Sequence, residues 1–128
     1  MSVEENKATV RRIWDECNRG NLEVIDECFA GNFVRYDHFG KTMDRAGYKR
    51  MIAFILKSSP DLHVTIDDIV GEGDKAAFRV TLTGTSTVVA GPTPPSGKPY
   101  TFKEVYFARF EGGKVVEYVN LNRDVSSP

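Results

Sequence analysis

The most regular alternation of hydrophobic and polar positions lies near the end of the chain, between residues 97 and 124. One set of alternate residues there contains Phe102, Glu104, Tyr106, Ala108 and Phe110, and the other contains Lys103, Val105, Phe107 and Arg109. A period of two is typical of a β-strand. The sequence Glu111-Gly112-Gly113-Lys114 predicts a tight turn into a second strand, residues 115–124. Large apolar groups occur on both faces of this hairpin, so we expect both faces to be covered.

Helical spacing of apolar residues dominates the first half of the chain. Ser2 and Glu5 predict a capping box at the start of a first helix, which Gly20 ends. We expect Asn21 to cap a second, shorter helix that runs to about residues 30–32. Asp44 predicts the start of a third helix, and residues 58–60 its end. The expected buried positions of the three helices are, in turn, Val10, Ile13, Trp14 and Cys17; Leu22, Ile25 and Phe29; and Tyr48, Met51, Ile52, Ile55 and Leu56.

Two further strands are predicted between the third helix and the hairpin. Residues 62–70 alternate, residues 71–74 form a turn, and residues 76–89 return. Residues 90–99 contain four prolines and two glycines, which predicts a loop outside the sheet. Three helices followed by an antiparallel meander predict an α+β fold with helices on one face of a sheet. A length of 128 residues is typical of one domain, so we expect residues 1–128 to form a single unit.

Composition narrows the classes of function. The formal net charge is −1, which gives no general attraction to nucleic acid or to an anionic membrane. No run approaches the about 20 apolar residues of a membrane span, and the first residues are charged rather than signal-like, so we expect a cytoplasmic protein. Cys17 and Cys28 fall at apolar helical positions, and we expect both to be reduced core residues.

Two groups of polar residues are candidates for a functional site. Glu104 and Tyr106 share the core-facing side of one predicted strand, where a carboxylate and a phenol need partners or a ligand. Asp37 and His38 are adjacent in a segment that is too polar for ordinary core, and in a strand-like segment only one of them would face inward. A turn-forming aspartate beside an exposed histidine, a core tyrosine and a solvated glutamate are the alternative interpretations. Two histidines in the whole chain make a zinc site improbable, and we expect no metal.

Three segments carry a family resemblance: NRGNLEVIDECFAGNFVRYDH, SSPDLHVTIDDIVGEGDKAAFRVTLTGT and PPSGKPYTFKEVYFARFEGGKVVEY. Together they resemble the nuclear-transport-factor-two-like (ketosteroid-isomerase-like) superfamily and, within it, the SnoaL-like polyketide cyclase group. The resemblance implies three N-terminal helices on a curved, mainly antiparallel sheet of four to six strands, which form a cone with one pocket. Members of the superfamily include cyclases, isomerases, hydrolases, dehydratases and non-catalytic binders, so the fold alone leaves the chemistry open.

The resemblance also implies roles for individual positions. Asp37 falls where similar ketosteroid isomerases have a general-base aspartate, and Tyr36 falls where similar cyclases often have a histidine. Tyr106 takes the place of a pocket Asp or His. Gap-free counting from Glu117 puts Arg123, with Asp124 beside it, where similar cyclases have a catalytic aspartate on the last strand. We therefore expect Arg123 in the pocket, paired with Glu104. The alternatives are a pair with Asp37 and a frayed C-terminus that leaves Arg123 in solvent.

Our first hypothesis is a cofactor-free enzyme that uses acid–base chemistry to isomerise or cyclise a small, largely apolar, polyketide-like carbonyl compound. Asp37 would take the proton and Tyr106 would stabilise the oxyanion. The substrate would contact Trp14, Tyr36, His38, Tyr48, Met51, Glu104 and Arg123. The alternatives are a non-catalytic protein that binds a small hydrophobic ligand, and a dimeric interaction module with a vestigial pocket. In each case we expect a homodimer that pairs through the sheet face carrying Val105 and Phe107.

Overall fold

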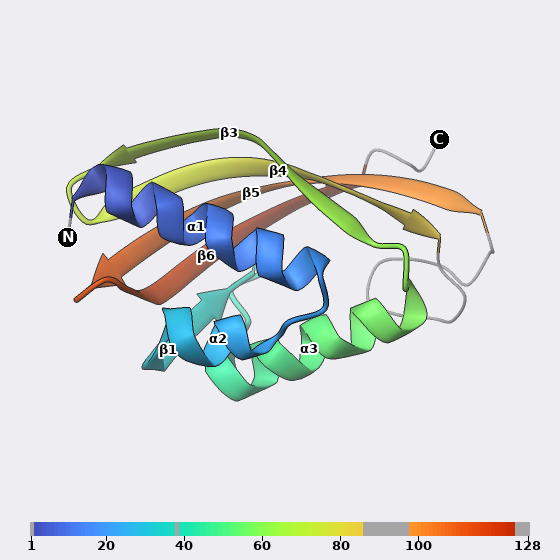
Figure 1. The fold of residues 1–128 in the computed structure, drawn as a ribbon, viewed down its shortest axis with the longest axis horizontal. Helices are drawn as coiled ribbons and strands as arrows, with labels where there is room; N and C mark the ends of the chain where they lie inside the picture. Colours follow the sequence, from blue (N-terminus) through green and yellow to red (C-terminus); the bar gives the residue numbers. More distant parts are fainter. Residues whose placement is uncertain (1, 38, 86–97, 125–128) are drawn as a thin grey trace.

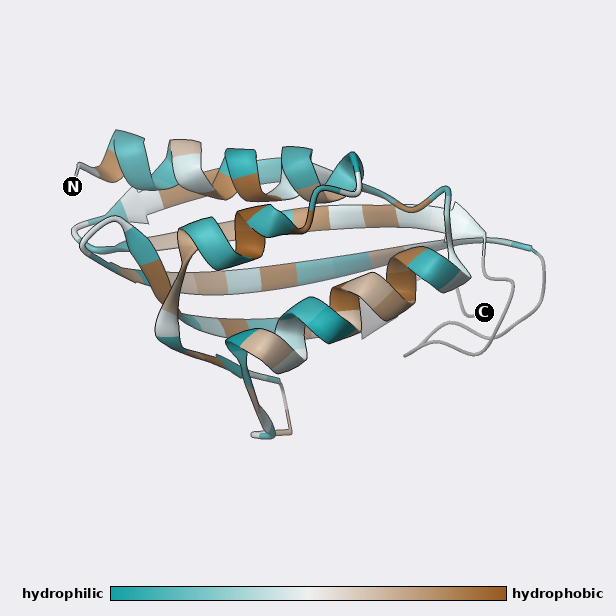
Figure 2. Ribbon diagram, turned by 60° about the horizontal axis from the view of Figure 1, so that its bottom comes forward, coloured by the Kyte–Doolittle hydropathy of each residue, from teal (hydrophilic) through white to brown (hydrophobic). Residues whose placement is uncertain are grey.

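The computed structural model describes residues 2–37, 39–85 and 98–124, except for the side chains of residues 122–124. Three helices lie over one face of a six-stranded sheet (Figures 1 and 2). The α+β fold predicted from the sequence is therefore confirmed, with the sheet at the upper end of the expected size. Among the described residues, no helix is both long enough and apolar enough to cross a membrane.

Helix α1 spans Val3–Asn18 and begins with the predicted capping box. The Glu5 amide donates to Ser2 Oγ at 3.1 Å, and the Ser2 amide donates to Glu5 Oε1 at 3.0 Å. These reciprocal bonds satisfy two donors that the first turn of a helix leaves open. The expected apolar stripe, Val10, Ile13, Trp14 and Cys17, is buried.

Helix α2 spans Glu23–Cys28 and is shorter than the sequence predicted. Its N-cap residue is Leu22, and the Asn21 side chain instead donates to Glu16, so the predicted Asn21 cap is wrong. The chain is already extended from Phe29, where strand β1 (Phe29–Tyr36) begins. Phe29 is nevertheless fully buried, as expected.

Helix α3 spans Arg45–Ser58 and begins at the predicted cap. Asp44 Oδ1 accepts a hydrogen bond from the Gly47 amide at 2.8 Å. Tyr48 and Ile52 are its buried apolar residues, and Met51 and Leu56 pack beside them. The helix lies beside β1 (Figure 1).

The sheet has the strand order β2-β1-β6-β5-β4-β3. The other strands are β2 (Thr42–Asp44), β3 (His63–Glu72), β4 (Lys75–Thr85), β5 (Pro99–Glu111) and β6 (Lys114–Asp124). Strands β3 to β6 form the predicted antiparallel meander, and Gly112 and Gly113 turn β5 into β6 with φ angles of 58° and 80°. Strand β1 pairs parallel with β6, a contact that the sequence pattern did not predict. Residues 86–89 of the predicted strand and residues 90–97 of the predicted loop lie outside the described residues. Pro99, predicted to lie in the loop, is instead the first residue of β5 and pairs with Thr85.

The helices cover only one face of the sheet. Phe102, Tyr106, Ala108 and Phe110 point toward them and are buried. The opposite face, which we call the outer face, carries Val70, Val105, Phe107 and Leu121, and all four are exposed in the single chain. The expectation that both faces of the hairpin are covered is therefore wrong for one chain taken alone.

Candidate functional site

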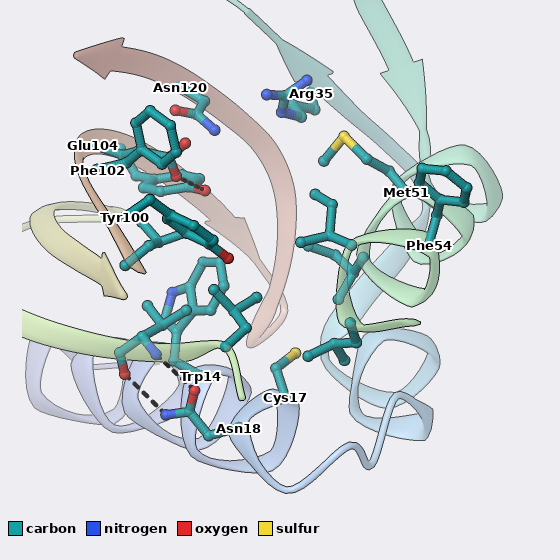
Figure 3. Close-up of a pocket in the computed structure, with 17 residues that line it drawn as sticks. Trp14, Cys17, Asn18, Arg35, Met51, Phe54, Tyr100, Phe102, Glu104 and Asn120 are labelled. Carbon is teal, nitrogen blue, oxygen red and sulfur yellow. Dashed lines mark hydrogen bonds between the residues drawn. The ribbon is translucent and has the colours of Figure 1, made fainter. Parts of the chain in front are cut away.

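A cavity of about 170 Å³ lies between the helices and the inner face of the sheet (Figure 3). Its walls come from α1, α3 and strands β1, β3, β4, β5 and β6, so segments from the whole length of the chain meet there. Most lining side chains are aliphatic or aromatic. Among the described residues that line it, Glu104 is the only carboxylate and Arg35 is the only cation.

Glu104 and Tyr106 enter the cavity from the same face of β5. The Tyr106 hydroxyl donates a hydrogen bond to Glu104 Oε1 at 2.8 Å. Residues i and i+2 of a strand point to the same side, and this places the two groups next to each other. Because the Tyr106 hydroxyl donates its hydrogen bond to Glu104, it does not at the same time donate to a substrate oxyanion.

Three aromatic contacts fix the ring of Tyr106. It stacks on Phe78, with ring centroids 5.0 Å apart and planes 5° apart. It also meets the edges of Trp14 and Tyr118, with centroids 5.5 and 5.1 Å away. A phenol held in this way positions the carboxylate that accepts from it.

The protonation of Glu104 is set by opposing effects. Burial is the largest and raises the pKa of Glu104 above its usual value. The hydrogen bond from Tyr106, the charge of Arg35 and the Asn120 amide each lower the pKa, but together they do not offset burial. A carboxyl group with a raised pKa is a stronger base than an exposed one, and this favours a role in general acid–base catalysis.

Arg35 and Asn120 complete the polar part of the cavity. Arg35 comes from β1 and Asn120 from the neighbouring β6, and both are buried (Figure 3). The Nε atom of Arg35 and the Oδ1 atom of Asn120 have no hydrogen-bond partner within the described part of the chain. Both side chains therefore keep polar capacity for a bound molecule.

Cys17 also lines the cavity and is free, as is Cys28. Burial raises the pKa of Cys17 to about 12, which keeps its thiol neutral. Within the part of the chain that the structure describes, no group of three or more His, Cys, Asp or Glu side chains could hold a metal ion.

The cavity brings together Trp14, Met51, Glu104 and Tyr106 from the predicted site. Tyr48 is not among the lining residues. It lies in the core, where its ring packs against Phe29, Phe33 and Tyr118. Tyr36 is half-buried at the end of β1 and does not line the cavity either, and His38 lies outside the described residues.

Asp37 follows β1 and does not line the cavity. Its Oδ1 atom accepts from the Phe39 amide at 2.8 Å and from the Lys41 amide at 2.9 Å. These bonds shape the loop between β1 and β2, in the manner of an Asx turn. The catalytic role predicted for Asp37 stays a prediction that these contacts do not favour.

The register of β6 changes the expectation for Arg123. Asn120 lies opposite Tyr106 and lines the cavity, whereas Leu121 lies opposite Val105 on the outer face. Arg123 is opposite Lys103, and Asp124 is opposite Phe102, which lines the cavity. Strand alternation thus assigns position 123 to the outer row and position 124 to the inner row. Arg35 is the described cation whose charge lowers the pKa of Glu104. The side chain of Arg123 lies outside the described part of the chain, so its predicted pairing with Glu104 stays a prediction.

Sequence reasoning missed Arg35 and Asn120 as site residues. Arg35 is two residues after Phe33, so period-two alternation from that buried phenylalanine points it inward. Asn120 is two residues after Tyr118, which is fully buried. Both signals are in the sequence, but they require knowing which face of each strand meets the helices.

Helices cover the inner face of the sheet and enclose with it one apolar cavity that holds a carboxylate and a guanidinium. This arrangement defines a class of small α+β proteins with an internal cavity. The family model for SnoaL-like polyketide cyclases matches residues 8–123. The chain therefore belongs to the SnoaL-like polyketide cyclase family, and the resemblance seen in the sequence is confirmed.

Solved structures agree with this assignment. AclR from Streptomyces galilaeus, a proposed hydroxylase, is 27% identical with a TM-score of 0.87, over 98% of this chain and 83% of AclR. IdmH from Streptomyces antibioticus, a proposed polyketide cyclase, is 26% identical with a TM-score of 0.82, over 94% of each chain. A SnoaL-like protein from Jannaschia sp. CCS1, 23% identical with a TM-score of 0.84, shares the fold over 98% of this chain and 94% of its own. A search of the curated proteins found no match.

Proposed function

We propose that the protein is a cofactor-free acid–base enzyme that isomerises or cyclises a small, largely apolar carbonyl compound of the polyketide type, with Glu104 as the residue that transfers the proton. The observation that carries the proposal is the setting of Glu104. It is the sole carboxylate among the described lining residues of an apolar cavity, and burial raises its pKa. Such a carboxyl group is suited to removing a proton from carbon next to a carbonyl group.

The proposed reaction begins when ionised Glu104 takes a proton from the carbon beside the substrate carbonyl. The electron pair of the broken C–H bond moves into the carbonyl and forms an enolate. Arg35 is the cation on the cavity wall that can stabilise the charge on the enolate oxygen, and Asn120 lies beside it. Tyr106 holds Glu104 in place through its 2.8 Å hydrogen bond.

The enolate can then follow one of two routes. In isomerisation, protonated Glu104 returns the proton to a different carbon of the same molecule. In aldol-type ring closure, the enolate carbon attacks a second carbonyl carbon, and protonated Glu104 gives its proton to the resulting alkoxide. Both routes regenerate ionised Glu104 and need placement and a tuned carboxyl group.

Family membership supports a cyclase or isomerase, and different reactions have been proposed for similar proteins of this fold. IdmH is a proposed polyketide cyclase and AclR a proposed hydroxylase, and both are about equally similar to this chain. The side chains of the cavity must therefore decide between reactions, which is why the test addresses Glu104 directly.

The first step can be tested with a probe substrate. We would follow exchange of the α-protons of 1-indanone in deuterated buffer by proton NMR, with and without the protein. We expect the protein to accelerate exchange, and we expect Glu104→Gln to reduce the enzymatic rate by about 10²- to 10⁴-fold, the usual contribution of a general base. Circular dichroism would check that the variant is folded.

Two matched variants separate Glu104 from the other candidate bases. Asp37→Asn removes the carboxylate of the β1–β2 loop, and Asp124→Asn removes the acid at the end of β6. We expect both to keep most of the exchange rate. Loss of exchange in one of them, with Glu104→Gln active, would transfer the role of base to that residue. Tight binding of apolar ketones without any accelerated exchange would instead indicate a non-catalytic binding protein.

A further inference from the structure

Arg35 is in an unusual position for an arginine. Its exposed fraction is 9%, and its Nε atom has no hydrogen-bond partner within the described part of the chain. None of the ion pairs between described residues includes it. An arginine stays charged at any physiological pH, and a buried charge without a partner is costly. A protein that keeps such a group in a cavity wall has a use for the charge.

Among the described lining residues, only Glu104 can neutralise Arg35. One oxygen of Glu104 accepts from Tyr106, and no ion pair between described residues joins Glu104 to Arg35, although the charge of Arg35 lowers the pKa of Glu104. Burial favours the protonated, neutral form of Glu104. The described lining side chains therefore carry a net positive charge whenever Glu104 is protonated.

Most of the remaining lining side chains are apolar. Met51 and Phe54 of α3 and Phe102 of β5 lie around the same space as Arg35 (Figure 3). A ligand that fits both features has an apolar, largely aromatic body and one negative group. The guanidinium offers donors in a planar fork that matches a delocalised oxyanion.

We infer that the cavity selects organic molecules that carry an ionised oxygen, either a carboxylate or the enolate of an acidic β-dicarbonyl, and that Arg35 binds this oxygen. This inference rests on the proposed function, which makes the cavity the substrate site, and it adds the chemical class of the substrate. A carboxylate would make Arg35 an anchor away from the reacting carbon. An ionised β-dicarbonyl would place the reacting group itself on Arg35.

Binding can be measured without knowing the natural substrate. Trp14 is the only tryptophan of the chain and lines the cavity, so its fluorescence reports on occupancy. We would titrate the protein with phenylacetate and with phenylacetamide, which have the same body and differ in charge. Calorimetry would confirm the affinities. We expect phenylacetate to bind about 10- to 100-fold more tightly, the range for a hydrogen bond to a charged group.

Benzoylacetone tests the second source of the oxyanion. Its enolate and its neutral form differ in ultraviolet absorption, so the fraction ionised in the complex can be read directly. If Arg35 binds the enolate, the bound molecule ionises at a lower pH than the free molecule. A shift with benzoylacetone and no preference for phenylacetate would assign the oxyanion to the reacting group, and the reverse result would assign it to a remote carboxylate.

The Arg35 variants decide whether the guanidinium is responsible. Arg35→Met keeps an apolar chain of similar length, and replacing a buried charge with an apolar group is often neutral or stabilising. We expect this variant to lose the preference for both anions and to keep its affinity for phenylacetamide. Arg35→Lys should recover part of the preference, because it restores the charge without the fork.

Two results would overturn the inference: equal binding of phenylacetate and phenylacetamide with no shift for benzoylacetone, or a preference that survives in Arg35→Met. Glu104→Gln separates this test from that of the proposed function. If that variant loses proton exchange but still prefers anions, both proposals stand. If anion binding fails while Glu104→Gln still abolishes exchange, only the inference about substrate charge fails.

Discussion

At the scale of single residues, Glu104 and Tyr106 act as one unit. The phenol donates to the carboxylate at 2.8 Å, and burial raises the pKa of both groups. The raised pKa of Tyr106 keeps its proton on the phenol oxygen, so that Tyr106 can donate its hydrogen bond to ionised Glu104. The bond favours the ionised form of Glu104 and counteracts part of the effect of burial.

Replacing Tyr106 with Phe should therefore change the pH dependence of catalysis. Without the donor, the ionised form of Glu104 loses stabilisation and its pKa rises further. Because the base acts in its ionised form, the acidic limb of the rate of indanone exchange should move to higher pH. The rate well above that limb should change much less.

Tyr100→Phe is the matched control for this prediction. Tyr100 also lines the cavity, but its hydroxyl donates to Ser59 Oγ at 2.8 Å and not to Glu104. Removing the Tyr100 hydroxyl should leave the acidic limb of the exchange rate at the same pH. If the acidic limb lies at the same pH in the wild type and in Tyr106→Phe, the hydrogen bond from Tyr106 does not affect the pKa of Glu104.

The candidate site could be predicted only in part. Glu104 and Tyr106 stand out because a period of two puts polar groups on a face that is otherwise apolar. Arg35 and Asn120 obey the same period, but they meet in the cavity because β1 pairs parallel with β6. That pairing joins segments about 80 residues apart in sequence, and no local pattern specifies it.

At the scale of elements, the sequence predicts the bounds of α1 and α3 better than those of α2. Ser2 and Asp44 form the caps that their side chains favour, since a short polar side chain can reach the open amides of the first turn. The end of α2 has no such marker. Cys28 is helical and Phe29 extended although both are buried, so tertiary packing decides the boundary.

Gly84 of β4 leaves room for the ring of Tyr100, which lines the cavity. It lies opposite Tyr100 in the register of β4 and β5, and a Cβ atom there would be 2.6 Å from the Tyr100 hydroxyl oxygen. Gly84→Ala should push the Tyr100 ring aside and weaken its bond to Ser59. We expect a loss of about 1 to 3 kcal/mol in the free energy of unfolding, measured by urea denaturation.

Gly31→Ala is the control for Gly84→Ala. Gly31 lies in β1, and a Cβ atom at this position has nothing within 4 Å. Stability should change by less than about 0.5 kcal/mol, as for an ordinary surface site. Equal effects of the two substitutions would mean that alanine is disfavoured in the strands generally, rather than excluded by Tyr100.

At the scale of the whole molecule, the helices cover the inner face and leave the outer face open. Two neighbouring rows cross four strands there. The first contains Val70, Ala77, Phe107 and Val119, and the second contains Asp68, Arg79, Val105 and Leu121. Phe107 is 52% exposed and Val70 is 60% exposed. Val70, Val105, Phe107 and Leu121 thus form an exposed group of neighbouring apolar side chains, and a patch of this kind marks an interaction surface.

We propose that a second copy of the chain covers the outer face. Charged side chains of both signs adjoin the apolar ones: Asp68 and Arg79 occupy one end of the second row, and Arg109 pairs with Glu117 in the row beyond Phe107 and Val119. A twofold axis through the patch would place the surface of one copy on the same surface of another, so mixed charges at its margin can pair across the interface. We expect a dimer in light scattering at about 50 μM, a working concentration suited to an interface of ordinary affinity.

Phe107→Asp should break this dimer, because it puts a carboxylate near the centre of the apolar rows in both copies and leaves both unpaired when the faces meet. Phe39→Asp is the control, since Phe39 is also exposed but lies in the loop between β1 and β2. It should leave the mass unchanged. Both variants should keep their cavities, so indanone exchange by the Phe107→Asp monomer would show that one chain holds a complete site. A wild-type monomer at this concentration, or a dimer that survives Phe107→Asp, would contradict the proposed interface.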